Sequence, residues 1–164
     1  MGVFEAIKMR RSIRKYKDTP LPKEKLCKVL EAGRIAPSAG NRQEWKFIVV
    51  TDKAMRDKLV DAARGQAFVG QAGAIVVGCA SDPTKKWHMV DVAIAIDHMA
   101  LTAYEEGLGT CWIGAFEEDK VKEILGIPEN TKVVILLAIG VPDMEGVPRP
   151  RKALEEIVLW ERWS

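Results

Sequence analysis

Apolar residues alternate with polar ones in patterns that predict helices and strands in succession along most of the chain. Intervals of three and four residues are typical of a helix with one buried face. They occur in five segments, namely Val3–Met9, Lys23–Ile35, the segment after Asp52, Val90–Glu106 and Asp119–Leu125. The fourth is apolar over much of its surface, so we expect it to lie deep in the domain or against a partner chain.

Four other segments are continuously apolar, which is typical of strands buried on both faces. They are Lys46–Thr51, Ala74–Ala80, Thr110–Phe116 and Val133–Val141. Helices must therefore flank both faces of the sheet that these strands form. The chain has 164 residues without an internal repeat or linker, so we expect one domain over residues 1–164.

The last 23 residues, 142–164, have a different character. Residues 142–152 are rich in proline and arginine, and an apolar stretch that includes Trp160 and Trp163 follows them. Two tryptophans are too apolar for a loose tail. We therefore expect the end of the chain to bury itself against a further surface.

Composition narrows the classes of function. Hydrophobic residues make up 48% and charged residues 29%, and the net charge is +2. This balance does not favour nucleic-acid or membrane binding, and the longest apolar runs are too short to span a bilayer. Cys27, Cys79 and Cys111 are odd in number, lack a C-x-x-C pair and have apolar neighbours, so we expect buried free thiols. No signal peptide is recognised, and we expect a cytoplasmic protein.

A dense run of cations follows the first predicted helix, comprising Lys8, Arg10, Arg11, Arg14, Lys15 and Lys17. By itself such a run is most simply a solvated basic stretch. Ser12 lies within it, however, and a second basic group, Arg149, Arg151 and Lys152, lies near the other end of the chain. Arginine has a forked geometry that fits phosphate oxygens. If the two groups fold together, they form a phosphate site.

A loop rich in small and amide residues links the second helix to the first strand. Asn41 and Gln43 offer both hydrogen-bond donors and acceptors, and Pro37 and Ser38 are suited to pass close over a flat ring. A capped helix end that leads into a strand explains the same residues equally well. Both interpretations remain open from this segment alone.

Other motifs carry little chemistry. The glycines of residues 107–114 follow a helix and lack the G-x-G-x-x-G spacing, which excludes a dinucleotide-binding loop. His88 and Asp91 form a weak metal pair without further ligands, and a surface or interface role is the simpler interpretation. We expect no metal site and no essential catalytic side chain.

Four motifs in order resemble the nitroreductase superfamily over essentially the whole chain. They are Arg-Arg-Ser-Ile-Arg at 10–14, Ala-Pro-Ser-Ala-Gly-Asn-x-Gln-x-Trp at 36–45, Gly-Leu-Gly-Thr-Cys-Trp-Ile-Gly at 107–114, and the Arg-Lys-x-Leu-Glu-Glu-Ile-Val-x-x-x-x-Trp ending at 151–163. The chain departs from larger members in two respects. It lacks the lid helices between Ala80 and Val90, and Glu44 occupies a position where proline is common.

The resemblance implies an α+β fold with a central mixed sheet flanked by helices, and a homodimer with FMN at the subunit interface. It also implies that the C-terminal arm packs on the partner subunit. Arg10, Arg11, Ser12 and Arg14 would hold the phosphate, ribityl chain and pyrimidine side, with phosphate contacts from Arg149 and Arg151. Pro37, Ser38 and Ala39 would cover the ring from the other subunit, with Asn41 and Gln43 close by. Gln66 would read the pyrimidine edge, and Trp112, Ile113 and Gly114 would lie by the reactive nitrogen.

The implied function is an FMN-dependent oxidoreductase of the nitroreductase type. It would move a hydride from NADH or NADPH through the flavin to a small acceptor, a nitroaromatic, a quinone or a flavin, by a ping-pong cycle. Three alternatives remain: a dimer that stores or senses flavin, a specialised flavin enzyme such as a dehalogenase, and a nucleic-acid binder that uses the basic run.

Overall fold

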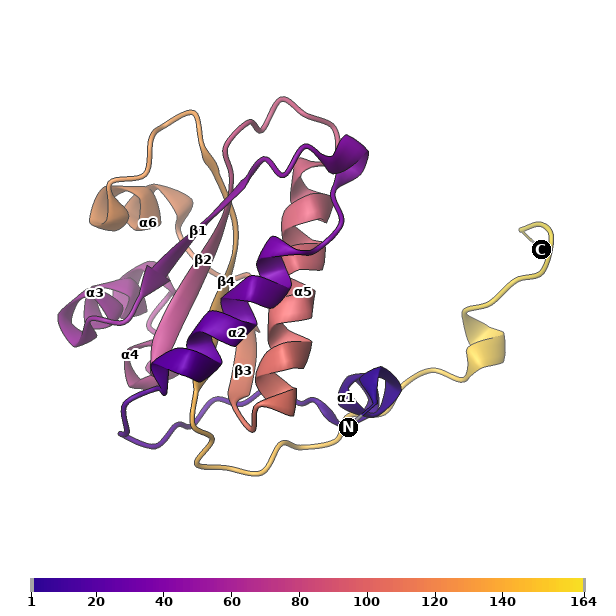
Figure 1. Cartoon of the computed structure of the whole chain (residues 1–164), viewed down its shortest axis with the longest axis horizontal. Helices are drawn as coiled ribbons and strands as arrows, with labels where there is room; N and C mark the ends of the chain where they lie inside the picture. The colour runs from indigo at the N-terminus through magenta and orange to yellow at the C-terminus, as the bar shows by residue number, and fades with distance from the viewer. Residues whose placement is uncertain (1, 164) are drawn as a thin grey trace.

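The computed structural model describes residues 2–163, in which helices and strands follow one another much as the patterns predict (Figure 1). The helices are α1 (Val3–Met9), α2 (Lys23–Arg34), α3 (Lys53–Ala62), α4 (Phe68–Gln71), α5 (His88–Glu105) and α6 (Glu118–Leu125). The strands are β1 (Trp45–Val50), β2 (Ala74–Ala80), β3 (Gly109–Ile113) and β4 (Lys132–Gly140). Two short 3₁₀ helices, η1 (Ala39–Asn41) and η2 (Leu154–Glu156), complete the order.

The four strands form one sheet in the order β1-β2-β4-β3. All three pairings are antiparallel, with Trp45 opposite Ala80 in the first and Gly109 opposite Gly140 in the last. The α+β class is confirmed. The parallel component of the expected mixed sheet is limited, within residues 2–163, to the bridge between Ser12 and Thr110, because the segment after α1 joins β3 at one point.

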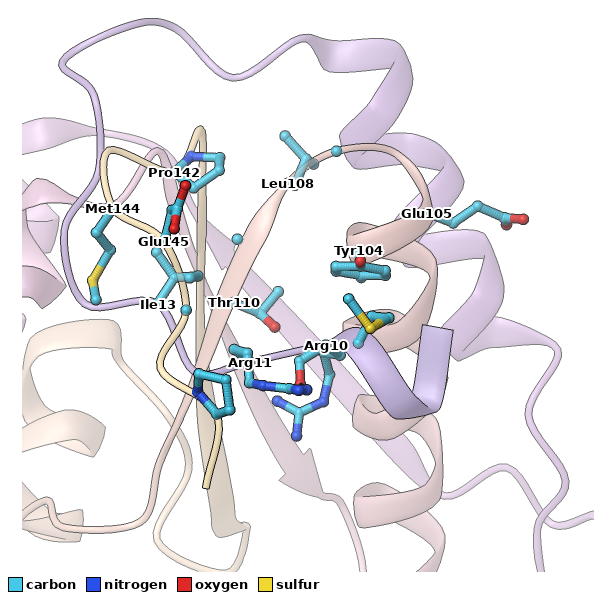
Figure 2. Close-up of a pocket in the computed structure, with 15 residues that line it drawn as sticks. Arg10, Arg11, Ile13, Tyr104, Glu105, Leu108, Thr110, Pro142, Met144 and Glu145 are labelled. Carbon is cyan, nitrogen blue, oxygen red and sulfur yellow. The ribbon is translucent and has the colours of Figure 1, made fainter. Parts of the chain in front are cut away.

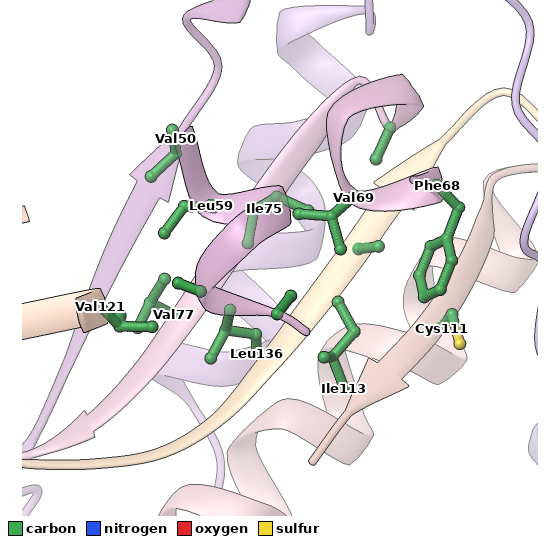
Figure 3. Close-up of a cluster of buried hydrophobic side chains, with 14 of the residues drawn as sticks. Val50, Leu59, Phe68, Val69, Ile75, Val77, Cys111, Ile113, Val121 and Leu136 are labelled. Atoms are coloured by element: carbon green, nitrogen blue, oxygen red, sulfur yellow. The ribbon is translucent and has the colours of Figure 1, made fainter. Parts of the chain in front are cut away.

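Helices cover both faces of this sheet, as the continuous apolar strands predict. Helices α2 and α5 pack on one face, and α3, α4 and α6 lie over the other. Figure 3 shows the layer between the sheet and helices α3 and α4, where Leu59, Val69 and Phe68 pack against Ile75 and Leu136 of the sheet. The sheet is therefore a rigid platform from which the loops and chain ends project.

Helix α5 lies against the sheet along one side only. Its buried residues include Val92, Ile96 and Met99, whereas Met89 and Val90 are about half exposed. The apolar surface expected of this helix is thus partly unpartnered within one chain. Among the helices of residues 2–163, none has the length and apolar character needed to cross a membrane.

The cysteines behave as predicted at two positions and differently at the third. Cys79 and Cys111 are buried free thiols, but Cys27 is exposed. Cys27 lies on α2 between Leu26 and Val29, which both face the core, so the helical turn directs its side chain to the other side. The expectation of three buried thiols is wrong for Cys27.

The end of the chain extends away from the body of the molecule (Figure 1). The side chains of Trp160 and Trp163 are 78% and 92% exposed. Leu154 and Ile157 are each 63% exposed. One chain alone supplies no surface for this apolar arm.

Candidate functional site

The Arg-Arg-Ser-Ile-Arg segment runs extended from the end of α1 to the edge of β3. The backbone N–H of Ile13 donates to the Thr110 carbonyl at 2.9 Å, and the Ile13 side chain is buried. Side chains alternate in an extended segment, so Ser12 and Arg14 are directed away from the core side that Ile13 occupies. The sheet thus fixes the direction of the polar side chains.

The start of the C-terminal arm crosses the same segment. Tyr16 forms an antiparallel bridge with Pro142, and the Asp143 N–H donates to the Lys15 carbonyl at 3.0 Å. One residue further, the Met144 sulfur accepts from the Arg14 N–H at 3.4 Å. These contacts bring the second basic group of the sequence beside the first.

Both basic groups line one cavity of about 350 Å³. Its lining consists of Arg10, Arg11, Ser12, Arg14, Met144, Val147, Arg149 and Arg151. Two of the arginines are oriented by main-chain carbonyls: Arg11 donates to Lys8 at 2.6 Å, and Arg151 donates to Arg149 at 3.2 Å. The fold therefore unites the two ends of the chain, as a phosphate site requires.

The charge of this cavity is not balanced by the protein. Within residues 2–163, none of the five arginines forms an ion pair with a carboxylate, although ten such pairs involve other residues. Several guanidinium groups with one hydroxyl match the several charge-assisted donors that a phosphate dianion needs. The arrangement fits a phosphate group.

Cys111 of β3 is close to Ser12 and Arg14 of this cavity and remains a thiol at neutral pH. Burial raises its pKa, and the nearby positive charge of Arg14 and contact with Ser12 only partly oppose that effect. Because the thiolate is the nucleophilic form, Cys111 does not supply a nucleophile.

The end of β3 carries the next group of predicted site residues. Trp112 is half-buried, Ile113 is buried, and Gly114 is exposed just beyond the strand. Gln66 lies beside them, since its amide nitrogen donates to the Ala115 carbonyl at 3.1 Å and to the Ala63 carbonyl at 2.8 Å. With that nitrogen engaged, the Gln66 amide oxygen is the atom that remains to accept from a ligand.

The amide loop is held in a specific shape. The Ser38 hydroxyl accepts from the Gln43 N–H at 3.0 Å, and the Gln43 amide donates to the Asn41 side-chain oxygen at 3.1 Å. Asn41 and Gln43 both have positive φ angles, 53° and 55°, a conformation that non-glycine residues adopt at a cost. A capped helix end does not require two such residues, so the shape of this loop favours a role in binding.

The structure does not bring this loop to the arginine cavity of the same chain. The Ala39 N–H donates to Asp91 at 3.0 Å, which places the loop at the start of α5. Arg10 instead lines a cavity together with Tyr104, which is near the far end of that helix. The thirteen residue steps from Asp91 to Tyr104 correspond to about 20 Å of helix. The two parts of the predicted site are therefore separate within one chain.

Sequence patterns missed three residues that shape these sites. Met144 and Val147 line the arginine cavity, but nothing in the sequence marks an isolated apolar residue in a proline-rich segment as a cavity wall. Asp91, considered above as half of a weak metal pair, anchors the amide loop instead. The sequence feature that could have drawn attention to Asp91 is its position three residues after His88, where α5 begins.

A profile described as "Nitroreductase family" matches residues 7–82 and 68–141 of the chain. Among curated proteins, an NADH dehydrogenase of Thermus thermophilus is 31% identical, with 92% of each sequence covered.

Solved structures give the same result. An FMN-dependent nitroreductase of Clostridium difficile R20291 superposes with a TM-score of 0.89 at 31% identity, and the match covers 98% of this chain and 99% of that one. An NADPH:FMN oxidoreductase of Vibrio harveyi, solved with NAD+, gives a TM-score of 0.91 at 28% identity, covering 99% of this chain and 78% of that one.

The unbalanced arginine cavity predicts that simple phosphate stabilises the protein. Inorganic phosphate should raise Tm in a concentration-dependent way, because a ligand that binds only the folded state shifts the unfolding equilibrium. The double variant Arg149→Ala/Arg151→Ala should lose most of that increase, whereas Lys58→Ala, which removes an exposed cation elsewhere, should keep it. Differential scanning calorimetry at constant ionic strength measures both, and an equal response of the two variants would contradict the assignment.

Proposed function

Because the chain belongs to the nitroreductase family, we propose that it is an NAD(P)H-dependent oxidoreductase with FMN as its cofactor. The observation that carries this proposal is the cavity around Ser12, whose five arginines form no ion pair with a carboxylate of residues 2–163. The phosphate of FMN supplies the negative charge that the cavity lacks. The names of the relatives, which refer to NADH, NADPH and FMN, support the donor and the cofactor.

The arginine cavity holds the phosphate end of the cofactor in this proposal. Arg10, Arg11, Arg149 and Arg151 contact the phosphate, while Ser12 and Arg14 extend toward the ribityl chain and the pyrimidine side. Gln66 accepts from the pyrimidine edge through its free amide oxygen. Trp112, Ile113 and Gly114 lie by the reactive end of the ring.

The other wall of the pocket comes from a second copy of the chain. Pro37, Ser38 and Ala39 cover the ring, and Asn41 and Gln43 lie near it. The separation of about 20 Å along α5 supports this division, because one chain does not bring its own loop to its own arginines. The active form is accordingly a homodimer.

Unpartnered apolar surface supports the same assembly. Val3 and Phe4 of α1 are 74% and 76% exposed, and the C-terminal arm presents Trp160 and Trp163. Contiguous apolar patches of this kind are typical of interaction sites. We propose that the arm packs on the partner subunit.

When bound, FMN would supply the chemistry of hydride transfer from NADH or NADPH to a small acceptor such as a nitroaromatic, a quinone or a flavin, in a ping-pong cycle. The chain's own contribution is electrostatic. Arg14 and the backbone N–H near Gly114 stabilise negative charge at the ring, in a site that the partner's loop screens from water. No side chain of the protein needs to form a covalent bond.

We further propose that the protein acts in the cytoplasm. Two buried free thiols suit a reducing compartment, and burial raises the pKa of Cys79 to about 11, which keeps that thiol protonated.

Turnover distinguishes this enzyme from a protein that stores flavin. Anaerobic mixing of the FMN-loaded protein with NADH or NADPH should bleach the yellow absorbance within seconds, and a quinone added afterwards should restore it. Stopped-flow absorbance follows both steps. A flavin that stays oxidised with both nucleotides would contradict the oxidoreductase and favour storage.

Mixed dimers test whether the pocket uses two chains. One variant carries Arg149→Ala and Arg151→Ala, and the other carries Asn41→Ala and Gln43→Ala; each homodimer should bind FMN poorly. A differently tagged heterodimer of the two should contain one intact pocket and bind one FMN per dimer. If the loop served its own chain, both pockets of that heterodimer would be defective and no binding would return.

A further inference from the structure

A second, larger cavity of about 540 Å³ lies beside the arginine cavity (Figure 2). It opens between the end of α5, the turn into β3 and the first residues of the C-terminal arm. Its apolar walls are formed chiefly by Met9, Ile13, Tyr104, Leu108, Pro142 and Met144. The volume is within the range of sites that enclose small organic molecules.

One polar side chain in the wall of this cavity is left without a partner. Thr110 is 2% exposed, and its hydroxyl is the buried side-chain oxygen that makes no hydrogen bond within residues 2–163. In the view of Figure 2 the side chain lies between β3 and the cavity, with the hydroxyl turned toward the side of Arg10 and Arg11. A buried hydroxyl without a partner destabilises the folded state, because it loses the hydrogen bonds that it makes to water in the unfolded chain.

A valine in place of Thr110 would avoid the cost of this buried hydroxyl. Valine has nearly the same shape as threonine, has no hydroxyl and is preferred in strands. The neighbouring positions of β3 in the core are Cys111 and Ile113, which are apolar. A hydroxyl at Thr110 is therefore best explained by a ligand that completes its hydrogen bond.

The charges around the cavity define the polar group of that ligand. Arg10 and Arg11 are half-buried at one end, whereas Glu105 and Glu145, also in the lining, are exposed to water. Figure 2 shows the Glu105 side chain directed away from the cavity. Because solvent screens exposed charges most, the positive groups determine the local potential.

We propose that this cavity binds a small, flat apolar acid, whose carboxylate accepts from the Thr110 hydroxyl and faces Arg10 and Arg11. The apolar body lies between Tyr104 and Leu108 on one side and Met144 on the other. The site adjoins the FMN pocket of the proposed function and shares Arg10, Arg11 and Met144 with it, whereas Thr110 and the Gly107–Gly109 turn line this cavity alone. It does not depend on flavin chemistry.

Isothermal titration calorimetry with 2-naphthoate tests the proposal. The flavin-free protein is titrated, and one naphthoate should bind per chain. Arg149→Ala/Arg151→Ala should bind it equally well, since Arg149 and Arg151 line the arginine cavity and not this one. Thr110→Val should weaken binding by about tenfold, since one hydrogen bond to a charged acceptor is lost. Thr131→Val, at a half-buried threonine before β4 that does not line the cavity, is the matched control and should bind as the unaltered chain does.

Two further measurements separate a ligand site from a structural role. Without naphthoate, Thr110→Val should raise Tm, because the unpartnered hydroxyl is removed, whereas Thr131→Val should not. The cation 2-naphthylmethylamine, of similar shape, should bind at least about tenfold more weakly than the acid.

Three results would overturn the proposal. They are the absence of naphthoate binding, equal affinity in Thr110→Val and Thr131→Val, and loss of binding in Arg149→Ala/Arg151→Ala. The last result would place the acid in the arginine cavity.

Discussion

Five guanidinium groups line one small cavity and pair with no carboxylate in the described part of the chain, residues 2–163, and backbone hydrogen bonds hold the segments that carry them there. Like charges at short range repel one another, so they stay together only where the backbone leaves them little choice or an anion joins them. The bond from Ile13 to β3 fixes one group, and the bond from Asp143 to Lys15 fixes the path to the other. The sheet therefore contributes stability to a site that is unfavourable without its ligand.

Helix α5 imposes the second constraint. It keeps the amide loop at one end, through Asp91, and the first basic group near its other end. A pocket that needs both parts is complete only when a second chain supplies the missing one. The exposed apolar residues of α1 and the tryptophans of the C-terminal arm agree with such an assembly.

Sequence patterns predicted most of the elements because the sheet is buried on both faces and its strands are continuously apolar. They missed α4, Phe68–Gln71, since four residues are too few to show a helical period. They also extended the third strand to Phe116, whereas β3 ends three residues earlier, at Ile113 opposite Leu136. Local composition could not show that Cys27 faces outward.

Some parts of the candidate site could be predicted from the sequence and others could not. The two basic groups are plain in the sequence, and the structure brings them together as the phosphate interpretation requires. The anchoring of the loop by Asp91 and the unpartnered hydroxyl of Thr110 depend on contacts between distant segments, which no local pattern contains. The roles of Gln66 and of residues 112–114 came from the family resemblance and remain proposals.

The most direct measurement compares FMN with riboflavin, which differs from it only in lacking the phosphate. Both are titrated into the flavin-free protein and followed by quenching of flavin fluorescence. If Arg10, Arg11, Arg149 and Arg151 bind the phosphate, FMN should bind at least about a hundredfold more tightly than riboflavin, which corresponds to loss of two or more charge-assisted hydrogen bonds. Equal affinity for the two flavins would contradict the account.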